Sequence, residues 1–234
     1  MYILSIESSR YMGGIALLEN DSVIDSYIFN VKATYSEKLL YNINFLLKNS
    51  KIKSIENIDL VAISEGPGSF TGLRIGFSVA KTVSYVKNIP IIGVNSLKAM
   101  TYPYLFDNNL IAPLIDARRN EIFASAYIEE KGKIREIVKT GAYKLEKFLK
   151  ILKEYDYRKI FIGEASRNRF KSKILKHSKN SKIVDFNTYI YTPVTIGKLA
   201  YKRYKKNDFE NLIEFEPAYY RKSDAEINYE NKKT

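Results

Sequence analysis

The chain has 234 residues, no cysteine and a formal net charge of +12, from 38 lysines and arginines against 26 aspartates and glutamates. Without cysteine it forms neither disulfides nor thiolate centres, and without a signal-like or membrane-spanning apolar run it is expected to be a soluble cytoplasmic protein. The charge favours an anionic partner such as tRNA or an acidic protein, although a composition rich in lysine, asparagine, isoleucine and tyrosine explains a basic surface without any ligand.

Apolar spacing in the first part of the chain predicts strands that alternate with helices. The helix expected over Glu37–Lys48 has an apolar stripe, and Ser36 is placed to cap it. The short apolar run that ends at Ile63 is typical of a buried strand. The expected elements are strands at 2–6, 13–18, 22–31, 58–63 and 90–94 and helices at 37–48, 73–86 and 97–102, the last capped by Asn95 and Ser96.

A glycine-rich loop over residues 64–72 joins the strand that ends at Ile63 to the next helix. Bare backbone amides at a helix N-terminus make a generic anion site, and Thr71 is placed to be the N-cap of this helix. The loop lacks the Gly-Lys-Ser/Thr of a phosphate-binding loop. An ordinary strand-to-helix turn is therefore favoured over phosphate binding.

The second part of the chain repeats the opening of the first. An apolar strand, an acidic residue (Glu7 or Asp116), a polar turn and two further strands follow one another in both parts. Thr192 and Pro193 open a last helix, as N-cap and first helical residue. Alternating strands and helices predict an α/β fold. The expected elements are strands at 111–115, 121–128, 134–139, 159–163 and 182–186 and helices at 144–154, 168–177 and from 192.

This repeat divides the chain into two halves and a tail. Residues 1–104 form the N-terminal half, with the glycine-rich loop and the helices expected to meet a partner. Residues 105–222 form the C-terminal half, and residues 223–234 form a polar tail.

The chain has a single histidine, His177, at a basic helix end. A cation there suits the helix dipole, and no carboxylate lies near it in sequence. Serine–histidine catalysis and histidine-based metal sites are therefore poor hypotheses for this chain.

Four motifs follow one another along the chain: Gly66-Pro67-Gly68-Ser69-Phe70-Thr71-Gly72-Leu73-Arg74-Ile75-Gly76, Asn95-Ser96-Leu97, Asp116-Ala117-Arg118-Arg119-Asn120-Glu121-Ile122 and Pro217-Ala218-Tyr219-Tyr220-Arg221. Together they resemble the bacterial TsaB family, also called YeaZ. The long glycine motif is highly specific, and the others add support through their order. The resemblance runs over essentially the whole chain, from Ile3 to Arg221.

The resemblance implies the fold shared by actin, sugar kinases and the Hsp70 ATPase domain, with two similar βββαβα halves. It also implies a role in making threonylcarbamoyladenosine beside the anticodon of tRNA. In that family the protein is a non-catalytic partner of its relative TsaD, and the small ATPase TsaE joins the pair. The partners so implied are TsaD, TsaE, tRNA through the complex, and a second copy of the chain when it is alone.

The resemblance further implies that the metal site of TsaD is absent here. TsaD holds a metal through a pair of histidines, and the matching positions in this chain are Tyr35 and Leu39. A leucine cannot ligate a metal, and a tyrosine is a rare ligand at neutral pH. We therefore expect no metal site and no catalytic residue.

Nucleotide binding is also expected to be weak or absent, so that the chain needs no cofactor. The turn after the first strand carries the bulky Tyr11 and Met12 where a loop that encloses phosphates needs small residues. The corresponding turn of the second half has Arg118 and Arg119 after Asp116. These arginines can clamp a phosphate, but pairing with nearby acids is an equal alternative.

A protein-binding surface is the remaining expectation. Gly72, Gly76 and Ala80 recur every four residues and make a smooth helix face that a partner helix can approach. On this hypothesis Gly76→Leu impairs pairing and leaves the monomer folded. The resemblance implies that the outer sides of this helix and the one before it contact TsaD. The residues expected to face the partner are Tyr35, Leu39, Leu73, Arg74, Gly76 and Phe77.

Two other classes of function stay open. In the first, the chain is an enzyme that acts alone, either an actin-fold ATPase or kinase or a peptidase, although the sequence shows no nucleophile–base pair. Alternatively it is a free-standing tRNA-binding module, although its tyrosines are scattered and do not alternate with basic residues along a strand.

Overall fold

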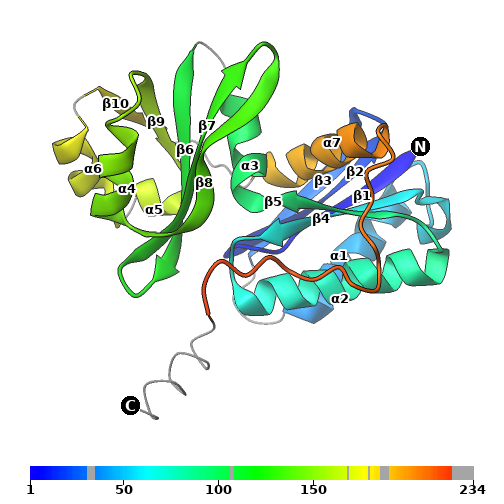
Figure 1. Cartoon of the computed structure of the whole chain (residues 1–234). Coiled ribbons are helices and arrows are strands. Elements are labelled where there is room, and N and C mark those ends of the chain that lie inside the picture. Colours follow the sequence, from blue (N-terminus) through cyan, green and yellow to red (C-terminus); the bar gives the residue numbers. More distant parts are fainter. Residues whose placement is uncertain (31–34, 106–107, 168, 179, 185–189, 223–234) are drawn as a thin grey trace.

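The computed structural model describes residues 1–30, 35–105, 108–167, 169–178, 180–184 and 190–222, and these form two five-stranded sheets with helices on their faces (Figure 1). The first sheet has the order β3-β2-β1-β4-β5, and the second has the order β10-β9-β6-β7-β8. The strands of the first sheet are β1 (Tyr2–Glu7), β2 (Met12–Glu19), β3 (Ser22–Asn30), β4 (Leu60–Gly66) and β5 (Ile91–Asn95). Those of the second are β6 (Asn109–Arg118), β7 (Glu121–Glu130), β8 (Lys133–Lys144), β9 (Arg158–Ile162) and β10 (Ser181–Ile183).

The strands follow the same plan in both halves. Strands β1 to β3 form an antiparallel meander, and β4 then returns parallel to β1. Strands β6 to β8 and β9 repeat this pattern, so the predicted repeat is confirmed. The helices are α1 (Tyr35–Asn49), α2 (Phe70–Lys87), α3 (Ser96–Thr101), α4 (Leu145–Leu152), α5 (Glu164–Arg167), α6 (Lys171–His177) and α7 (Thr192–Tyr204), with short 3-10 turns at Ile55–Asn57 and Tyr102–Tyr104.

Strand β1 is buried on both faces because helices cover both sides of the first sheet. Leu4 and Ile6 belong to a core cluster with residues of α1 and α2, whereas Ile3 belongs to a cluster with Ile196 and Leu199 of α7. A strand buried on both faces reads as a continuous apolar run, which is why the sequence predicts it well. None of the helices in the described ranges is both long and apolar enough to span a membrane.

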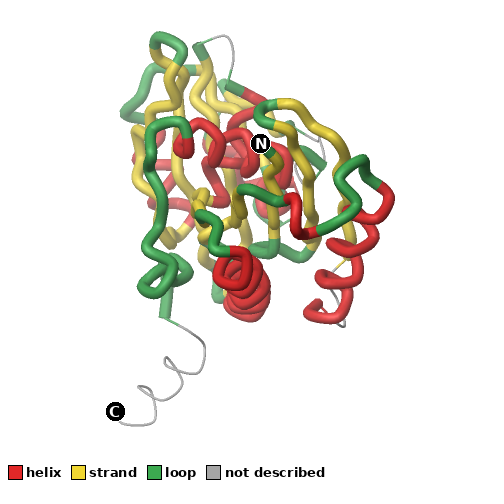
Figure 2. The backbone as a smooth tube through the Cα atoms, turned by 90° about the vertical axis from the view of Figure 1, so that its right-hand side faces the viewer, coloured by secondary structure: helices red, strands yellow, loops and turns green. Residues whose placement is uncertain are grey.

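The last part of the chain returns to the first half. Helix α7 packs against β1 and β2, and the segment after it runs along the outside of the molecule in both views (Figures 1 and 2). The amide of Glu210 donates to the carbonyl of Ile91 on edge strand β5 at 3.1 Å, and the amide of Ala218 donates to that of Glu65 at 2.8 Å. Residues 192–220, which the sequence assigns to the C-terminal half, therefore pack on the N-terminal sheet.

The helix caps differ from those expected at three of four positions. Asn95 caps α3, accepting from the amides of Leu97 and Lys98, as predicted. Helix α2 is capped by Ser69, whose hydroxyl accepts from the amide of Gly72 at 3.3 Å, so the prediction of Thr71 is wrong. Thr192 is the first residue inside α7, whose N-cap is Tyr191, and Ser36 lies inside α1, which begins at Tyr35.

Most element boundaries lie within a few residues of those predicted, with two larger differences. Strand β8 continues to Lys144 because it pairs with β7 along its whole length, across register shifts. The four-residue helix α5 is too short to give a periodic signal and was not expected. Val31 and the end of the strand predicted at 182–186 lie outside the described residues.

Candidate functional site

Helices α1 and α2 lie on the same face of the first sheet, and their inner sides form its core. Leu39 is completely buried, and Leu73 and Phe77 are 1% and 4% exposed. These three side chains were expected to face a partner, and that expectation is wrong for this conformation because they already pack on their own sheet. Helix α1 includes Tyr35, whose side chain lies outside the described part of the structure.

The small-residue face of α2 also points inward. A Cβ atom added to Gly76 would lie 2.0 Å from the Ser8 hydroxyl oxygen, and one added to Gly72 would lie 2.2 Å from the Ser8 carbonyl oxygen. The glycines therefore let α2 approach the end of β1 closely. The expectation that Gly76 faces a partner, and that Gly76→Leu spares folding, is corrected by this packing.

The outer side of the two helices carries large apolar side chains instead. On α1, Tyr41 and Phe45 stack with a ring separation of 6.4 Å, and Phe45 also meets Tyr27 of β3 edge-on at 5.4 Å. On α2, Tyr85 is 77% exposed and Val86 is 73% exposed. Aromatic groups of this kind are typical anchors of protein interfaces. We define the α1–α2 surface as the exposed residues Leu40, Tyr41, Phe45, Tyr85 and Val86.

Arg74 is the one predicted partner-facing residue, among those whose side chains are described, that is exposed. Its Nε donates to the Tyr219 hydroxyl at 3.0 Å, and Tyr219 stacks on Phe70 with a ring separation of 4.6 Å. Arg74 thus ties the returning C-terminal segment to the first turn of α2. Whether it also contacts a partner stays a prediction.

One residue of the α1–α2 surface, Leu40, lies next to a residue that was predicted to face a partner. Leu40 follows the buried Leu39, and the sequence reading placed both in one apolar stripe. Tyr41 and Phe45 are spaced by four residues, so they form a second, outward stripe on α1. This second stripe was the signal in the sequence that could have identified the surface.

The turn after β1 is packed tightly between the two halves. Glu7 is 1% exposed, and its Oε1 accepts from both the amide and the hydroxyl of Ser9 at 2.6 Å. Arg10 is 3% exposed and donates to the Thr192 hydroxyl of α7 at 2.7 Å, and its guanidinium lies 4.0 Å from Glu164 of α5. This arrangement links the first sheet to helices from the rest of the chain at the position of the expected first phosphate loop.

The corresponding turn of the second half is held by a different arginine from those expected. Asp116 accepts a hydrogen bond from the backbone amide of Arg118 at 2.7 Å. The guanidinium of Arg169 contacts both oxygens of Asp116, at 3.2 and 3.1 Å, and also donates to Asn120 at 2.6 Å. Asp116 is therefore paired with Arg169, and whether Arg118 and Arg119 clamp a phosphate or pair with acids stays open.

A polar cleft opens beside edge strand β5, between the two sheets, with a volume of about 760 Å³. Glu65 lines it, and burial raises the pKa of this carboxyl, with a further upward contribution from the nearby carboxylate of Glu210. Arg203 and Lys98 act in the opposite direction. Glu65 thus sits in the cleft as a largely buried acid whose charged form is poorly solvated.

Metal-ligating side chains do not cluster in the part of the chain that the structure describes: no group of three or more histidine, cysteine, aspartate or glutamate residues is placed to hold an ion. His177 ends α6, with its Nδ1 2.9 Å from the carbonyl of Lys173.

The paired sheets with their repeated topology define an actin-like α/β fold of the sugar-kinase type. A protein with similarity to peptidase YeaZ, from Pseudomonas aeruginosa, matches with a TM-score of 0.78 at 18% identity, over 94% of this chain and 99% of the other. A ROK family protein from Streptococcus pneumoniae matches with a TM-score of 0.50 at 14% identity, over 88% and 100%.

Sequence comparisons narrow this class to one family. The family model TsaD: tRNA N6-adenosine threonylcarbamoyltransferase matches residues 29–229. The tRNA threonylcarbamoyladenosine biosynthesis protein TsaB of Bacillus subtilis is 34% identical over 70% of this chain and 71% of its own length. That of Haemophilus influenzae is 26% identical over 94% and 93%. The chain belongs to the TsaB family.

Proposed function

We propose that this chain is a non-catalytic subunit in the biosynthesis of threonylcarbamoyladenosine on tRNA, and that it pairs with a transferase of the TsaD type. The curated relatives carry the name of this pathway. The observation that carries the pairing is the α1–α2 surface, where five large apolar side chains are exposed on two neighbouring helices. Exposed apolar groups on this scale favour a protein partner over a small ligand.

The similarity between the two kinds of chain supports a TsaD-type transferase as the partner. The TsaD family model matches most of this chain, so a TsaD-type transferase has equivalent helices on the equivalent sheet face. Related chains that present the same surface can pair about a pseudo-two-fold axis, as identical chains do in a two-fold dimer. The same surface would make a homodimer when the transferase is absent. Recruitment of TsaE, and of tRNA through the complex, belongs to the proposal.

The non-catalytic role is supported by what occupies two positions. Leu39, where the resemblance matches a metal-binding histidine of TsaD, is completely buried in the core. Arg10 fills the corner beside the first phosphate-loop position with its own guanidinium. We therefore propose that the chain acts without a bound cofactor. Isothermal titration with Mg-ATP tests this, because micromolar binding with turnover by the isolated chain would favour an enzyme.

Reconstitution of tRNA modification is the direct test of the function. TsaD, TsaE, the activated threonylcarbamoyl donor and tRNA are combined with and without this chain, and modified adenosine is measured. We expect product only when the chain is present. Undiminished product without it would contradict the proposal, and product formed by the chain without TsaD would contradict the non-catalytic role.

A further inference from the structure

The positive charge of the chain is concentrated in one segment. Residues 144–183 contain 13 lysines and arginines against 4 acids, a net charge of +9 out of the total of +12. Residues 1–104 contain 10 against 8 and are nearly neutral. A compositional bias toward lysine would raise the charge of all parts of the chain alike, so it does not explain this distribution.

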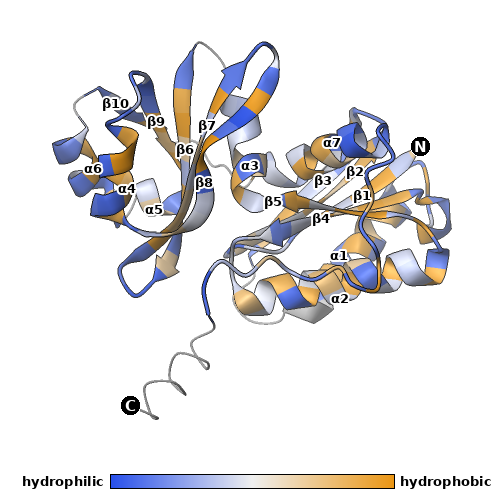
Figure 3. Ribbon diagram, viewed as in Figure 1, coloured by the Kyte–Doolittle hydropathy of each residue, from blue (hydrophilic) through white to orange (hydrophobic). Residues whose placement is uncertain are grey.

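The segment folds as α4, β9, α5, α6 and β10 at the outer end of the second sheet (Figure 1). The inner side of α4 is apolar and buried, including Phe148 and Leu152, so its charged residues are directed outward. Lys173 of α6 pairs with Glu146 of α4 at 3.0 Å, which places the polar sides of the two helices next to each other. Blue, hydrophilic stretches mark both helices in Figure 3.

Most cations of this segment have no internal counter-charge. Lys173 and Arg169 are engaged by Glu146 and Asp116. A further set of exposed lysines makes no ion pair within the described ranges. They lie on α4, at its C-cap, on α6 and on β10: Lys147, Lys150, Lys153, Lys171, Lys176 and Lys182. Like charges held together repel, so an anion bound among them would relieve the repulsion. We call α4, α6 and the adjoining ends of β9 and β10 the basic surface.

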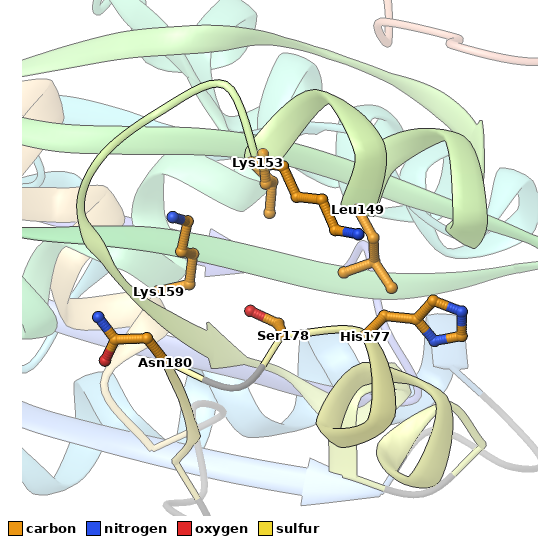
Figure 4. A pocket seen from close by; sticks show the side chains of 7 residues that line it. Leu149, Lys153, Lys159, His177, Ser178 and Asn180 are labelled. Atoms are coloured by element: carbon orange, nitrogen blue, oxygen red, sulfur yellow. The ribbon is translucent and has the colours of Figure 1, made fainter.

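A hollow of about 180 Å³ lies within the basic surface, between α4, β9 and the end of α6. Lys153, Lys159 and His177 line it together with the polar Ser178 and Asn180 (Figure 4). The Lys159 ammonium already donates to the Tyr155 carbonyl at 2.6 Å and has two further protons. The hollow thus combines cations and neutral hydrogen-bond donors, the groups that contact a phosphate.

We infer that the basic surface binds the phosphate backbone of RNA, with one phosphate seated in the hollow. Phosphate contacts by lysine need no apolar anchor. A specific protein interface is built around such anchors, and an interfacial membrane helix needs large apolar residues on one face. The exposed side of α4 and α6 offers Leu175 as its one large exposed apolar side chain among the described residues. That the RNA is tRNA rests on the proposed function.

Binding of the full-length chain to a tRNA transcript tests the inference, measured by fluorescence anisotropy between 50 and 200 mM salt. The variant Lys147→Gln/Lys150→Gln/Lys153→Gln removes three charges from α4 and its C-cap and keeps the helix propensity. We expect it to bind about tenfold or more weakly near 100 mM salt, and to lower the slope of log affinity against log salt by up to about 3. The matched control Lys131→Gln/Lys133→Gln/Lys139→Gln, from β8 and the turn before it in the same half, should bind like the wild type.

Equal losses in both variants, or none in either, would overturn the inference. Binding to vesicles with 20% phosphatidylserine is measured as well. The inference would also be overturned if the α4 variant lost binding to these vesicles but still bound tRNA like the wild type. Adding both variants to the reconstituted modification reaction separates this inference from the proposed function. If the chain is required but the α4 variant supports modification as well as the control at all salt concentrations, the function stands and a role for this surface in it fails. If the chain is dispensable, the proposed function fails whatever the binding shows.

Discussion

The α1–α2 surface and the basic surface occupy comparable places in the two halves, on helices that follow a βββ meander. The inner sides of both helix layers are alike, because each must supply apolar side chains to its own sheet. The outer sides differ: the first half exposes tyrosines and aliphatic side chains, and the second exposes unpaired lysines. A repeated framework thus constrains only the inner sides, which leaves each outer side free to match a different partner.

The largest expected effect separates the inner from the outer side of α2. Gly76→Leu should unfold the chain or cost about 3 kcal/mol or more, since its Cβ would lie 2.0 Å from the Ser8 hydroxyl oxygen and 2.8 Å from the Ser8 Cβ. Ser78→Leu, two residues further along the same helix and exposed, is the matched control and should change stability by less than about 0.5 kcal/mol. Chemical denaturation measures both. Wild-type stability of Gly76→Leu would contradict the close packing of this glycine on Ser8 and would mean that it faces outward.

The outer side of the first half should matter for pairing and not for folding. Tyr41→Ser/Tyr85→Ser removes two aromatic rings that are 67% and 77% exposed. We expect the affinity for a TsaD-type partner to fall by about 2–4 kcal/mol in total, the range of interface hot spots, as measured by calorimetry with the purified transferase. Leu175→Ser on α6 is the control from the other half, and its pairing should be unchanged. If both variants pair normally, the α1–α2 surface is not the interface.

The returning C-terminal segment should stabilise the first half in particular. Phe215 packs on Phe77 of α2 with a ring separation of 4.7 Å, and the Lys81 ammonium donates to its carbonyl at 3.0 Å. Phe215→Ala should cost about 1–3 kcal/mol, less than a fully buried phenylalanine, because it is only partly buried. Ile213→Ala, at a position that is 86% exposed, should cost almost nothing. Hydrogen exchange should show the loss of protection in α2 and β5 rather than in the second sheet.

The sequence predicted the framework of the fold because its main signals are local. Continuous apolar runs identified β1 and β4, and the repeated order of strand, acid and turn identified the two halves. The return of residues 192–220 to the first sheet depends on contacts between positions far apart in the chain, such as Ala218 with Glu65. Such contacts leave no periodic trace in a single sequence.

Most of the residues predicted to face a partner are buried on the inner sides of α1 and α2, whereas other large apolar side chains of these helices are exposed. Periodicity marks an apolar stripe without showing which edge of it is covered, so Leu39 and Leu40 could not be told apart. The glycines of α2 were assigned to a partner because a small-residue face fits any close neighbour, and Ser8 of the same chain is that neighbour. Charge, in contrast, is additive along the sequence, so the basic segment can be located by counting.

Two glutamates extend the comparison to pH, with opposite signs in the two halves. The pKa of Glu65 is raised, first by burial and then by Glu210, whereas that of Glu146 is lowered, first by the hydrogen bond from Lys173. A raised pKa means that the folded state binds more protons, so Glu65 makes stability fall as pH rises from the ordinary value of 4.5 through the raised pKa. A lowered pKa makes Glu146 stabilise the fold above its ordinary value, and this contribution disappears as pH falls through the lowered pKa.

Thermal unfolding of the wild type and of two variants between pH 4 and 8 measures this smallest effect. Glu65→Gln should raise the melting temperature at pH 7–8 and leave it nearly unchanged at pH 4, since the amide carries no charge to desolvate. Glu146→Gln should lower it slightly at pH 7–8, and 0.5 M salt should erase this difference because the pair is exposed. Lower stability of Glu65→Gln at pH 8 would mean that Arg203 and Lys98 outweigh burial, and that the cleft beside β5 holds a stabilised carboxylate.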